Sequence, residues 1–387
     1  MGFCRKPVVQ KVTACVFATG FLALGRARAA RQFIKQGAVY QAKDAGYFVH
    51  RIPALLATGK GTLLAFCEAR AGSASDSAST DLVLRRSLDD GKTWTRAQVV
   101  AHFPGFTVGN PTPVEDTATG VIWLLMTANP AGLTENEIDA GSPKGGRTVW
   151  ITYSNDDGVH WASAKEITAS ARKSNWTWYA TGPGNGIQLA NGRLVIPCDH
   201  KVAGTHAFYS HVIYSDDHGR TWKRGGSAGP ETNESAVVQL ADGSLLLNMR
   251  SYAGRHQRAV AVSQDGGLTW SKVRLDPTLI EPVCQASMVR GAAPRGDRKD
   301  RLLFSNPADT THRDRMTVRL SYDGGKSWPA ARLIHAGPSA YSSLTVLRDG
   351  TIGLLYERGA TNAYEEIEFA RFNLEWLTRG SDHSKAK

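Results

Sequence analysis

A motif of eight residues recurs five times along this chain of 387 residues. The first copy is Ser87–Trp94, and all copies share the pattern Ser-x-Asp-x-Gly-x-x-Trp. The others occupy Ser154–Trp161, Ser215–Trp222, Ser263–Trp270 and Ser321–Trp328, so that the copies start 48 to 67 residues apart. Repeats on this length scale are typical of propellers and solenoids.

Each copy has the chemistry of a turn between two strands. An apolar or β-branched run such as Ala259–Val262 precedes the serine and predicts a strand. The aspartate can accept hydrogen bonds from nearby backbone N–H groups, and the glycine adopts positive φ without steric cost. We therefore expect the five motif aspartates to be structural and not catalytic.

A second hairpin precedes each motif. Its turn is Asn191-Gly192, Asp242-Gly243 or Asp349-Gly350 in three cases, and looser versions occur at Thr58–Gly61 and Asp116–Gly120. Each repeat then contains four strands, A to D, with the motif between C and D. The A–B hairpins cover about 52–67, 111–127, 186–198, 235–249, 286–305 and 342–356. This pattern predicts an all-β, six-bladed β-propeller of four-stranded antiparallel blades with five motif turns.

The ends of the repeat region suggest how the ring closes. The sixth unit lacks the motif, and its third strand is predicted at Glu366–Phe372. A stretch near Phe33–Tyr40 is expected to pair beside that strand. The fifth unit has a long A–B connection at Ala292–Asp300. We expect one propeller domain over 30–380 and a frayed polar tail over 381–387.

The first 29 residues resemble an export signal. Basic residues up to Lys11 precede the apolar stretch Val12–Leu24, and Ala27-Arg28-Ala29 provides a small-x-small cleavage pattern. The apolar stretch is short for a membrane span. We expect residues 1–29 to be a secretory signal peptide, the mature protein to have no membrane span, and its location to be secreted or periplasmic.

The composition limits the kinds of binding partner that this chain can have. The formal net charge is +11, but the basic residues are scattered, which argues against a nucleic-acid surface and fits an anionic substrate. Beyond the leader, Cys67, Cys198 and Cys284 form an odd set with no metal-ligand spacing. We expect no disulfide framework, no metal and no cofactor.

The topology brings polar residues to one rim. Strand A is innermost in a blade, so the starts of A strands and the ends of B strands line the top of the central axis, opposite the motif turns. The polar residues at those positions are Arg51, Glu68, Arg70, Asp76, Asn110, Asp199, His200, Glu234, Arg250, Arg313, Tyr341 and Glu357.

Three arginines in this set indicate an anion. Arg51, Arg250 and Arg313 would repel one another unless they share a negative ligand, and guanidinium groups bind a carboxylate through paired, charge-assisted hydrogen bonds. Glu357 can hold Arg51 in place.

Three further residues can supply catalytic groups. Tyr341 and Glu234 can form a nucleophile–base pair, because a carboxylate can take the phenol proton and the arginines lower the cost of phenolate. A neutral nucleophile also avoids repulsion from a substrate carboxylate. Asp76, on a loop rich in Ser and Ala, can protonate a leaving oxygen.

These motifs resemble those of the bacterial exo-α-sialidases (neuraminidases), whose repeated turns are called Asp-boxes. The resemblance covers about 44–372 and is carried by Arg51-Ile52-Pro53, Phe66–Arg70 followed by Asp76, Asn233-Glu234 followed by Asn248-Met249-Arg250, Arg313 ahead of Met316-Thr317-Val318, Ser339–Ser342 and Tyr356-Glu357. Asp-boxes alone occur in many secreted propellers, whereas the ordered set of three arginines, Tyr, Glu and Asp is specific.

The resemblance implies hydrolysis of terminal sialic acid from glycans, glycoproteins or glycolipids, with retention through a tyrosyl-enzyme intermediate. Tyrosine nucleophiles are a recognised property of sialidases. It implies catalytic roles for Asp76, Glu234 and Tyr341, and substrate contacts from Arg51, Arg70, Arg250, Arg313, Glu357 and Asn110. We expect a monomer.

Several positions have competitors. Arg313 is preferred to Arg315, which lies two residues away, and to Arg319, which lies within a strand; Asp76 is preferred to Asp81, and Glu234 to Glu231. Asn110, Asp199 and His200 are candidates for contacts to the glycerol or N-acetyl arms of the sugar. At Asn185 the resemblance leads us to expect His, and the effect of this departure on side-arm recognition is left open.

Two other functions remain open at this stage. The same site can transfer sialic acid to an acceptor sugar or release an anhydro product by an intramolecular reaction. A non-catalytic propeller that binds glycans is the remaining alternative, but it predicts loss of part of the arginine, tyrosine and acid set, which is complete here.

Overall fold

Four-stranded antiparallel units make up nearly all of the computed structural model, which describes residues 1–4, 7, 31–205, 207–291 and 299–383. Blade one contains β2 (Val49–Ala57), β3 (Leu63–Arg70), β4 (Thr80–Ser87) and β5 (Gln98–Ala101). Blade two contains β6 (Phe106–Asp116), β7 (Val121–Pro130), β8 (Thr148–Ser154) and β9 (Lys165–Glu166). Blade three contains β10 (Trp176–Thr181), β11 (Ile187–Gln188), β12 (Leu194–Val202), β13 (Phe208–Ser215) and β14 (Lys223–Ala228). Blade four contains β15 (Thr232–Gln239), β16 (Leu245–Ser251), β17 (Gln257–Ser263) and β18 (Arg274–Ile280); blade five contains β19 (Ser287–Arg290), β20 (Leu302–Pro307), β21 (Asp314–Ser321) and the first half of β22 (Ala330–Val346); blade six contains the second half of β22, β23 (Ile352–Arg358), β24 (Glu366–Phe372) and β1 (Ile34–Gln41). The predicted six-bladed β-propeller is confirmed.

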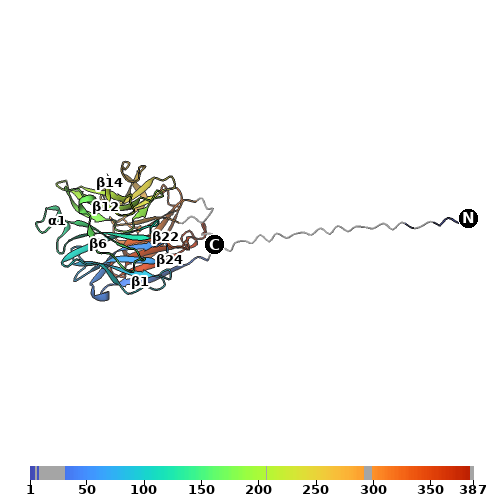
Figure 1. The fold of residues 1–387 in the computed structure, drawn as a ribbon, viewed down its shortest axis with the longest axis horizontal. Coiled ribbons are helices and arrows are strands. Elements are labelled where there is room, and N and C mark those ends of the chain that lie inside the picture. The colour runs from blue at the N-terminus through green and yellow to red at the C-terminus, as the bar shows by residue number, and fades with distance from the viewer. Residues whose placement is uncertain (5–6, 8–30, 206, 292–298, 384–387) are drawn as a thin grey trace.

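The ring closes by pairing the first strand with the last. β1 lies antiparallel to β24, with Ile34 opposite Phe372, and Figure 1 shows the blue β1 beside the red β24. β22 serves two blades, because its first half pairs with β21 and its second half with β23. The expected closure of the sixth blade is therefore confirmed.

The five motifs form the same turn. In each copy the serine Oγ donates to the aspartate Oδ1 at 2.7–2.9 Å, and this carboxylate accepts the backbone N–H four residues on at 2.9 Å. Hydrogen bonds from Thr93 lower the pKa of Asp89 to about 2. The motif aspartates therefore use their carboxylates to stabilise their own turns, as predicted.

Strand register separates the two rims. At one end of blade one, Leu63 lies opposite Ser87, next to the A–B turn and the first motif. At the other end, Arg70 lies opposite Thr80. The ends of the B strands therefore point to the rim opposite the motif turns.

Apolar side chains fill the spaces between neighbouring blades. Leu64 and Phe66 of blade one pack with Ile122 and Leu124 of blade two, and all four are almost fully buried. Alternate residues of each strand face the adjacent blade, as expected for period-two strands. The polar ends of the inner strands therefore lie at the central axis.

The structure differs from the predictions in blade three. Its inner strand does not begin near residue 186 but with β10, which pairs with β12 ahead of the short β11. The glycine- and proline-rich segment 182–186 interrupts the inner strand. The Asn191-Gly192 turn marks only the hairpin between β11 and β12, so it does not indicate the aromatic strand β10 that comes before them.

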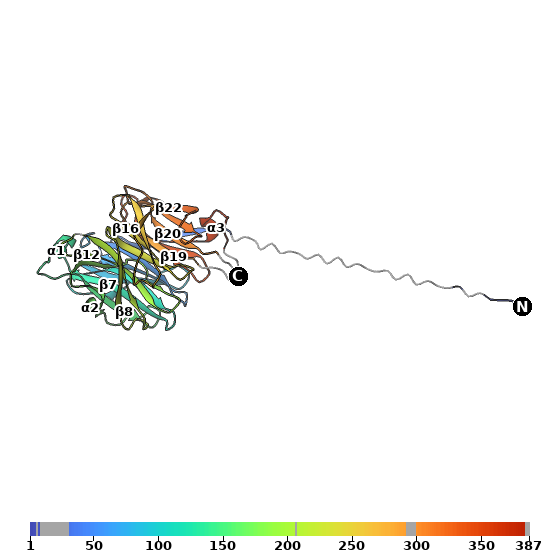
Figure 2. The same ribbon diagram turned by 90° about the horizontal axis from the view of Figure 1, so that it is seen from above.

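The C-terminal tail also differs from expectation. α3 (Leu374–Leu377) packs on blade five, and Asp382 is buried rather than frayed. Its carboxylate accepts from Arg301 Nε at 2.8 Å and Tyr322 OH at 2.8 Å. Figure 2 shows α3 and α1 (Glu135–Asp139) at opposite ends of the body.

Some predictions lie outside the described residues. These are nearly all of the expected leader 1–29, most of the connection Ala292–Asp300, and residues 384–387. Within the described part of the chain, no helix has the length and apolar character needed to cross a membrane.

Candidate active site

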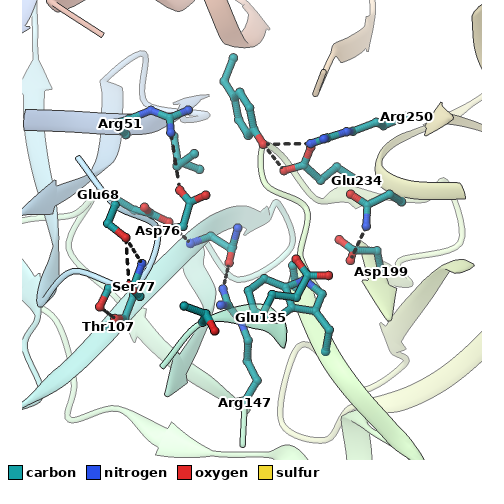
Figure 3. Close-up of a pocket in the computed structure, with 18 of the residues that line it drawn as sticks. Arg51, Glu68, Asp76, Ser77, Thr107, Glu135, Arg147, Asp199, Glu234 and Arg250 are labelled. Atoms are coloured by element: carbon teal, nitrogen blue, oxygen red, sulfur yellow. Dashed lines mark hydrogen bonds and ion pairs between the residues drawn. The ribbon is translucent and has the colours of Figure 1, made fainter. Parts of the chain in front are cut away.

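A pocket of about 500 Å³ opens at the predicted rim of the propeller. Its walls come from the inner ends of several blades and from the loop that carries α1. Among the residues that line it are Arg51, Glu68, Arg70, Asp76, Asn110, Asp199, Glu234, Arg250, Arg313 and Tyr341. Figure 3 shows Arg51 on one wall and Arg250 with Glu234 on the facing wall.

Five inner strands carry the same irregularity at the pocket. In β2, for example, three steps from Arg51 to Ala54 oppose two steps from Glu68 to Phe66. The same one-residue bulge occurs in four other inner strands, β6, β10, β15 and β22. A bulge re-aims side chains locally. The bulged segments contain Ile52, Asn110, Trp178, Glu234 and Tyr341, which all line the pocket.

The three predicted arginines meet around one tyrosine ring. The guanidinium carbons of Arg51 and Arg313 lie 5.4 and 5.7 Å from the ring centroid of Tyr341. Arg250 Nη1 lies 3.4 Å from its hydroxyl oxygen. Arg313 contacts Tyr364 OH and a backbone carbonyl, and no carboxylate forms an ion pair with it in the described chain. The cluster therefore carries excess positive charge.

The carboxylate of Glu357 links Arg51 and Ile52 of β2 to Tyr341 of β22. Its buried carboxylate accepts from Arg51 Nε at 3.1 Å, Arg51 Nη2 at 3.3 Å and Ile52 N at 2.8 Å. It also accepts from the backbone N–H of Tyr341 at 3.0 Å. Arg51 stacks on Tyr364, with its guanidinium carbon 3.9 Å from the ring centroid. Glu357 does not line the pocket, so it positions Arg51 and does not itself face a ligand.

Tyr341 and Glu234 form a short hydrogen bond. The tyrosine hydroxyl donates to Glu234 Oε1 at 2.5 Å, and Arg250 Nη1 donates to Glu234 Oε2 at 2.9 Å. Burial, and then the charge of Glu234, raise the pKa of Tyr341 well above its usual value, although Arg250 and Arg313 oppose this. The phenol is therefore neutral and hydrogen-bonded to a base in the free protein.

Asp76 lies at the mouth of the pocket with its side chain 80% exposed. Its Oδ1 is 2.6 Å from Arg70 Nη1 and 3.6 Å from Arg51 Nη1. Partial desolvation at the pocket mouth acts to raise the pKa of Asp76, but the charges of Arg70 and Arg51 outweigh this and lower it. Arg70 is held in turn by Glu68, whose Oε2 accepts from Arg70 Nη2 at 2.6 Å.

The competing residues lie elsewhere. Arg315 is exposed and outside the pocket, whereas Arg313 lines it. Asp81 accepts from Tyr47 OH at 2.6 Å and is not a lining residue. Glu231 is exposed outside the pocket, three residues before Glu234. In each pair the structure places the preferred residue at the pocket.

The structure places Asn185 and the side-arm candidate His200 away from the pocket. Asn185 donates to the carbonyl oxygens of Leu55 and Leu344 on neighbouring inner strands, and it does not line the pocket. Its replacement of an expected His therefore does not reach the pocket. His200 points to the opposite side of β12 from Asp199 and stacks on Trp176 at 3.5 Å between ring centroids.

Arg147 and Trp178 form a pair on the far wall that the sequence patterns do not predict. The guanidinium carbon of Arg147 lies 4.0 Å from the Trp178 ring centroid, and both residues line the pocket. Arg147 precedes a C strand, and Trp178 lies in the strand that was not predicted. The alternating aromatics of β10 were the available signal for Trp178.

Asp199 lies at the same wall, fully buried. Its Oδ1 accepts from Asn233 Nδ2 at 3.1 Å, and burial and then Glu234 raise its pKa well above the usual range. The wall away from the three arginines is thus polar but contains little net charge.

Comparisons with known proteins agree with this geometry. The model of the BNR repeat-like domain matches residues 61–354. A sialidase of Micromonospora viridifaciens is 37% identical over 348 residues, covering 86% of this chain and 52% of the relative. An exo-alpha-sialidase of Aspergillus fumigatus is 32% identical over 372 residues, covering 87% of both chains.

Solved structures give the same result. The Hadza microbial sialidase Hz136 superposes with a TM-score of 0.81 at 31% identity, covering 88% of this chain and 69% of that chain. The chain spans about half the length of the Micromonospora relative and 62% of a Bacteroides fragilis sialidase that is 34% identical. On the family match and the identities over most of its length, the chain belongs to the sialidase family of BNR-repeat propellers.

Proposed function

We propose that this chain is a retaining exo-α-sialidase that hydrolyses terminal sialic acid from glycans, glycoproteins or glycolipids. The observation that carries the proposal is the 2.5 Å hydrogen bond from Tyr341 to Glu234 within a cluster of three arginines. Family membership supports the reaction class, and the site residues supply the chemistry.

The arginine cluster binds the substrate carboxylate in this proposal. Arg51 and Arg250 each have a carboxylate partner, and Arg313 has none among the described residues. The three guanidinium groups therefore have unused donors and excess charge, which a carboxylate satisfies through charge-assisted hydrogen bonds. This places the anomeric carbon, to which the carboxylate is attached, near the hydroxyl of Tyr341.

Tyr341 is the proposed nucleophile. As its oxygen bonds to the anomeric carbon, Glu234 accepts the phenol proton and the bond to the leaving oxygen breaks. In the second step a water oxygen bonds to the anomeric carbon, the bond to Tyr341 breaks, and Glu234 returns the proton to the phenolate. Two displacements at one carbon retain its configuration.

Asp76 is the proposed acid and base. It protonates the leaving oxygen in the first step and takes a proton from water in the second. Its lowered pKa in the free protein opposes the acid role. The substrate carboxylate compensates, because it adds negative charge beside Arg51 and so weakens the attraction that lowers this pKa.

We further propose that the protein acts as a monomer after export to the periplasm or the medium. The support is the leader-like sequence over residues 1–29 and the completeness of the site within one chain.

The test is release of methylumbelliferone from its α-N-acetylneuraminic acid glycoside. Tyr341→Phe is expected to lower kcat on the order of a hundredfold or more, because it removes the nucleophile. Tyr356→Phe is the matched control: Tyr356 is also buried and donates to a carboxylate, Glu368, at 2.5 Å, but does not line the pocket. Near wild-type turnover by Tyr341→Phe would show that the nucleophile is assigned wrongly.

NMR of the first sugar formed separates the reaction types. The α-anomer of the free sugar indicates hydrolysis with retention. An anhydro sugar would assign the chain to intramolecular transfer, and a sialylated acceptor would indicate transferase activity. Sialic acid binding without turnover by the wild type would indicate a glycan-binding propeller.

A further inference from the structure

Tyr364 contacts two of the three arginines of the cluster. Its ring stacks on Arg51, whose guanidinium carbon lies 3.9 Å from the ring centroid. Its hydroxyl oxygen accepts from Arg313 Nη1 at 3.2 Å. Tyr364 is partly buried and does not line the pocket, so it contacts the arginines from outside the pocket. One side chain therefore fixes the position of Arg51 relative to that of Arg313.

Arg313 is held differently from the other two arginines. Each of those pairs with a glutamate, at 3.1 and 2.9 Å. No carboxylate forms an ion pair with Arg313 in the part of the chain that the structure describes. Its second contact, from Nη2 to the carbonyl oxygen of Val283, is 3.4 Å long, which is beyond the usual range for such a hydrogen bond. The hydroxyl of Tyr364 is therefore the closer polar partner of Arg313.

A phenol can hold Arg313 without neutralising it. The tyrosine hydroxyl is an uncharged acceptor. A carboxylate at the same place would offset the positive charge that attracts the carboxylate of a substrate. Because Arg51 and Arg250 already have glutamate partners, the excess charge of the cluster belongs mainly to Arg313. The orientation of Arg313 therefore matters most for anion binding.

The loop between β23 and β24 that carries Tyr364 is closed on itself by Glu365. The carboxylate of Glu365 accepts from the backbone N–H groups of Ala360, Thr361 and Asn362 at 2.8–3.1 Å. Hydrogen bonds from the Thr361 hydroxyl and then from these N–H groups lower the pKa of Glu365 to about 2. Asn362 Oδ1 in turn accepts from the backbone N–H of Tyr364 at 2.9 Å. The loop therefore holds the Tyr364 ring in place through its own hydrogen bonds.

We propose that Tyr364 is a positioning residue for binding of the substrate carboxylate. Its ring fixes the guanidinium plane of Arg51, and its hydroxyl orients Arg313 while leaving the charge of Arg313 for the ligand. The inference rests on the proposed function, which places the carboxylate among the three arginines. Tyr364 acts through the arginines and does not touch the substrate.

Tyr364→Phe keeps the ring and removes the hydroxyl. This variant is expected to raise KM for the methylumbelliferyl glycoside about tenfold, which corresponds to about one hydrogen bond. Its kcat is expected to stay within about twofold of the wild-type value, because the carboxylate is bound alike in the ground state and the transition state.

The ratio of two inhibition constants gives a readout that a merely structural role would not change. N-acetylneuraminic acid and its C1 amide differ only in the charged carboxylate. The wild type should bind the acid more tightly, and Tyr364→Phe should reduce this preference about fivefold to tenfold. A general disturbance of the pocket would weaken both inhibitors alike.

Tyr364→Leu removes the ring as well, and Tyr214→Leu is its matched control. Since Arg51 then also loses its stacking partner, Tyr364→Leu should raise KM further than Tyr364→Phe does. Tyr214 stacks on Arg193, with the guanidinium carbon 4.2 Å from the ring centroid, and neither residue lines the pocket. The control should keep the wild-type KM and the wild-type ratio of inhibition constants.

The outcomes separate this inference from the proposed function. If the wild type prefers the acid and Tyr364→Phe keeps both the wild-type KM and the wild-type ratio, the inference is overturned and the proposed function stands. Equal inhibition of the wild type by the acid and the amide would refute carboxylate binding by the arginines, and the inference with it. Absence of wild-type turnover would refute the proposed function as a whole, together with the inference. If Tyr364→Leu does not fold, Tyr364→Phe decides, because it loses a single oxygen atom.

Discussion

Glu357→Gln removes one charge and no heavy-atom volume, and it tests how the site is held together. Each carboxylate oxygen of Glu357 accepts two hydrogen bonds: Oε1 from Arg51 Nε and Ile52 N, and Oε2 from Arg51 Nη2 and Tyr341 N. Whichever way a glutamine amide is oriented, its NH2 group faces two donors. The variant also leaves the buried Arg51 without its closest carboxylate.

The size of the effect follows from these contacts. Two buried donors left unsatisfied cost about 1–3 kcal/mol each, and breaking a buried ion pair by removing one partner costs about 3–5 kcal/mol. These costs overlap because they involve the same atoms, so we expect destabilisation of about 3–5 kcal/mol. Because Arg51 also loses its fixed orientation, KM is expected to rise about tenfold or more.

Chemical denaturation and steady-state kinetics measure the two effects, with Asp382→Asn as the control. Asp382 is also buried and bound by both Nε and Nη2 of an arginine, Arg301, but lies outside the pocket. It should lower the unfolding midpoint and leave KM unchanged. If Glu357→Gln kept both the wild-type midpoint and the wild-type KM, the positioning role of Glu357 would be refuted.

Two further predictions concern stability. Burial lowers the pKa of His200 to about 3 and that of His211 well below its usual value, so the unfolded chain binds more protons below about pH 6.5. The contribution of these neutral histidines to the free energy of unfolding is fully present above that pH and is lost as the pH falls toward 3. His200→Gln should therefore flatten a plot of Tm against pH. An equally steep plot for the variant would count against this reasoning. Gly91 has φ +82°, and a Cβ added there would lie 2.0 Å from the Phe369 ring, so Gly91→Ala should lower the free energy of unfolding by about 2–5 kcal/mol. Gly120 has a similar φ of +73° but open space around it, so Gly120→Ala should lower it by only about 1–2 kcal/mol. Equal denaturation midpoints for the two glycine variants would contradict the packing argument.

The sequence predicted the blade count and the rim because both depend on periodic signals. Five motif turns and the Asn-Gly or Asp-Gly hairpins mark where strands reverse, and strand order in a blade then assigns each residue to a rim. Arg51 and Tyr341 were found in this way, as starts of inner strands. The expected secretory leader remains a prediction.

The rest depends on details that periodicity does not encode. Tyr341 and Glu234 reach each other because one-residue bulges re-aim both side chains, and nothing in a single sequence marks a bulge of this kind. Arg147 was not predicted because its place at the pocket depends on packing against Trp178, which lies in a strand that the sequence pattern did not reveal. Asn185 was misplaced because its segment, between β10 and β11, turns toward the inner strands instead of the pocket.

The pairing of β1 with β24 has a consequence for how the protein is made. Ile34 leaves the ribosome early, but its partner Phe372 is among the last residues synthesised. At about 5–20 residues per second, the strand waits roughly 20–70 s for its partner. During that time both β1 and the growing sheet present unpaired edges, which are sites for aggregation. The final blade therefore assembles only after nearly the whole chain has emerged, and a chain that ends before Phe372 keeps an open edge however sound its other five blades are.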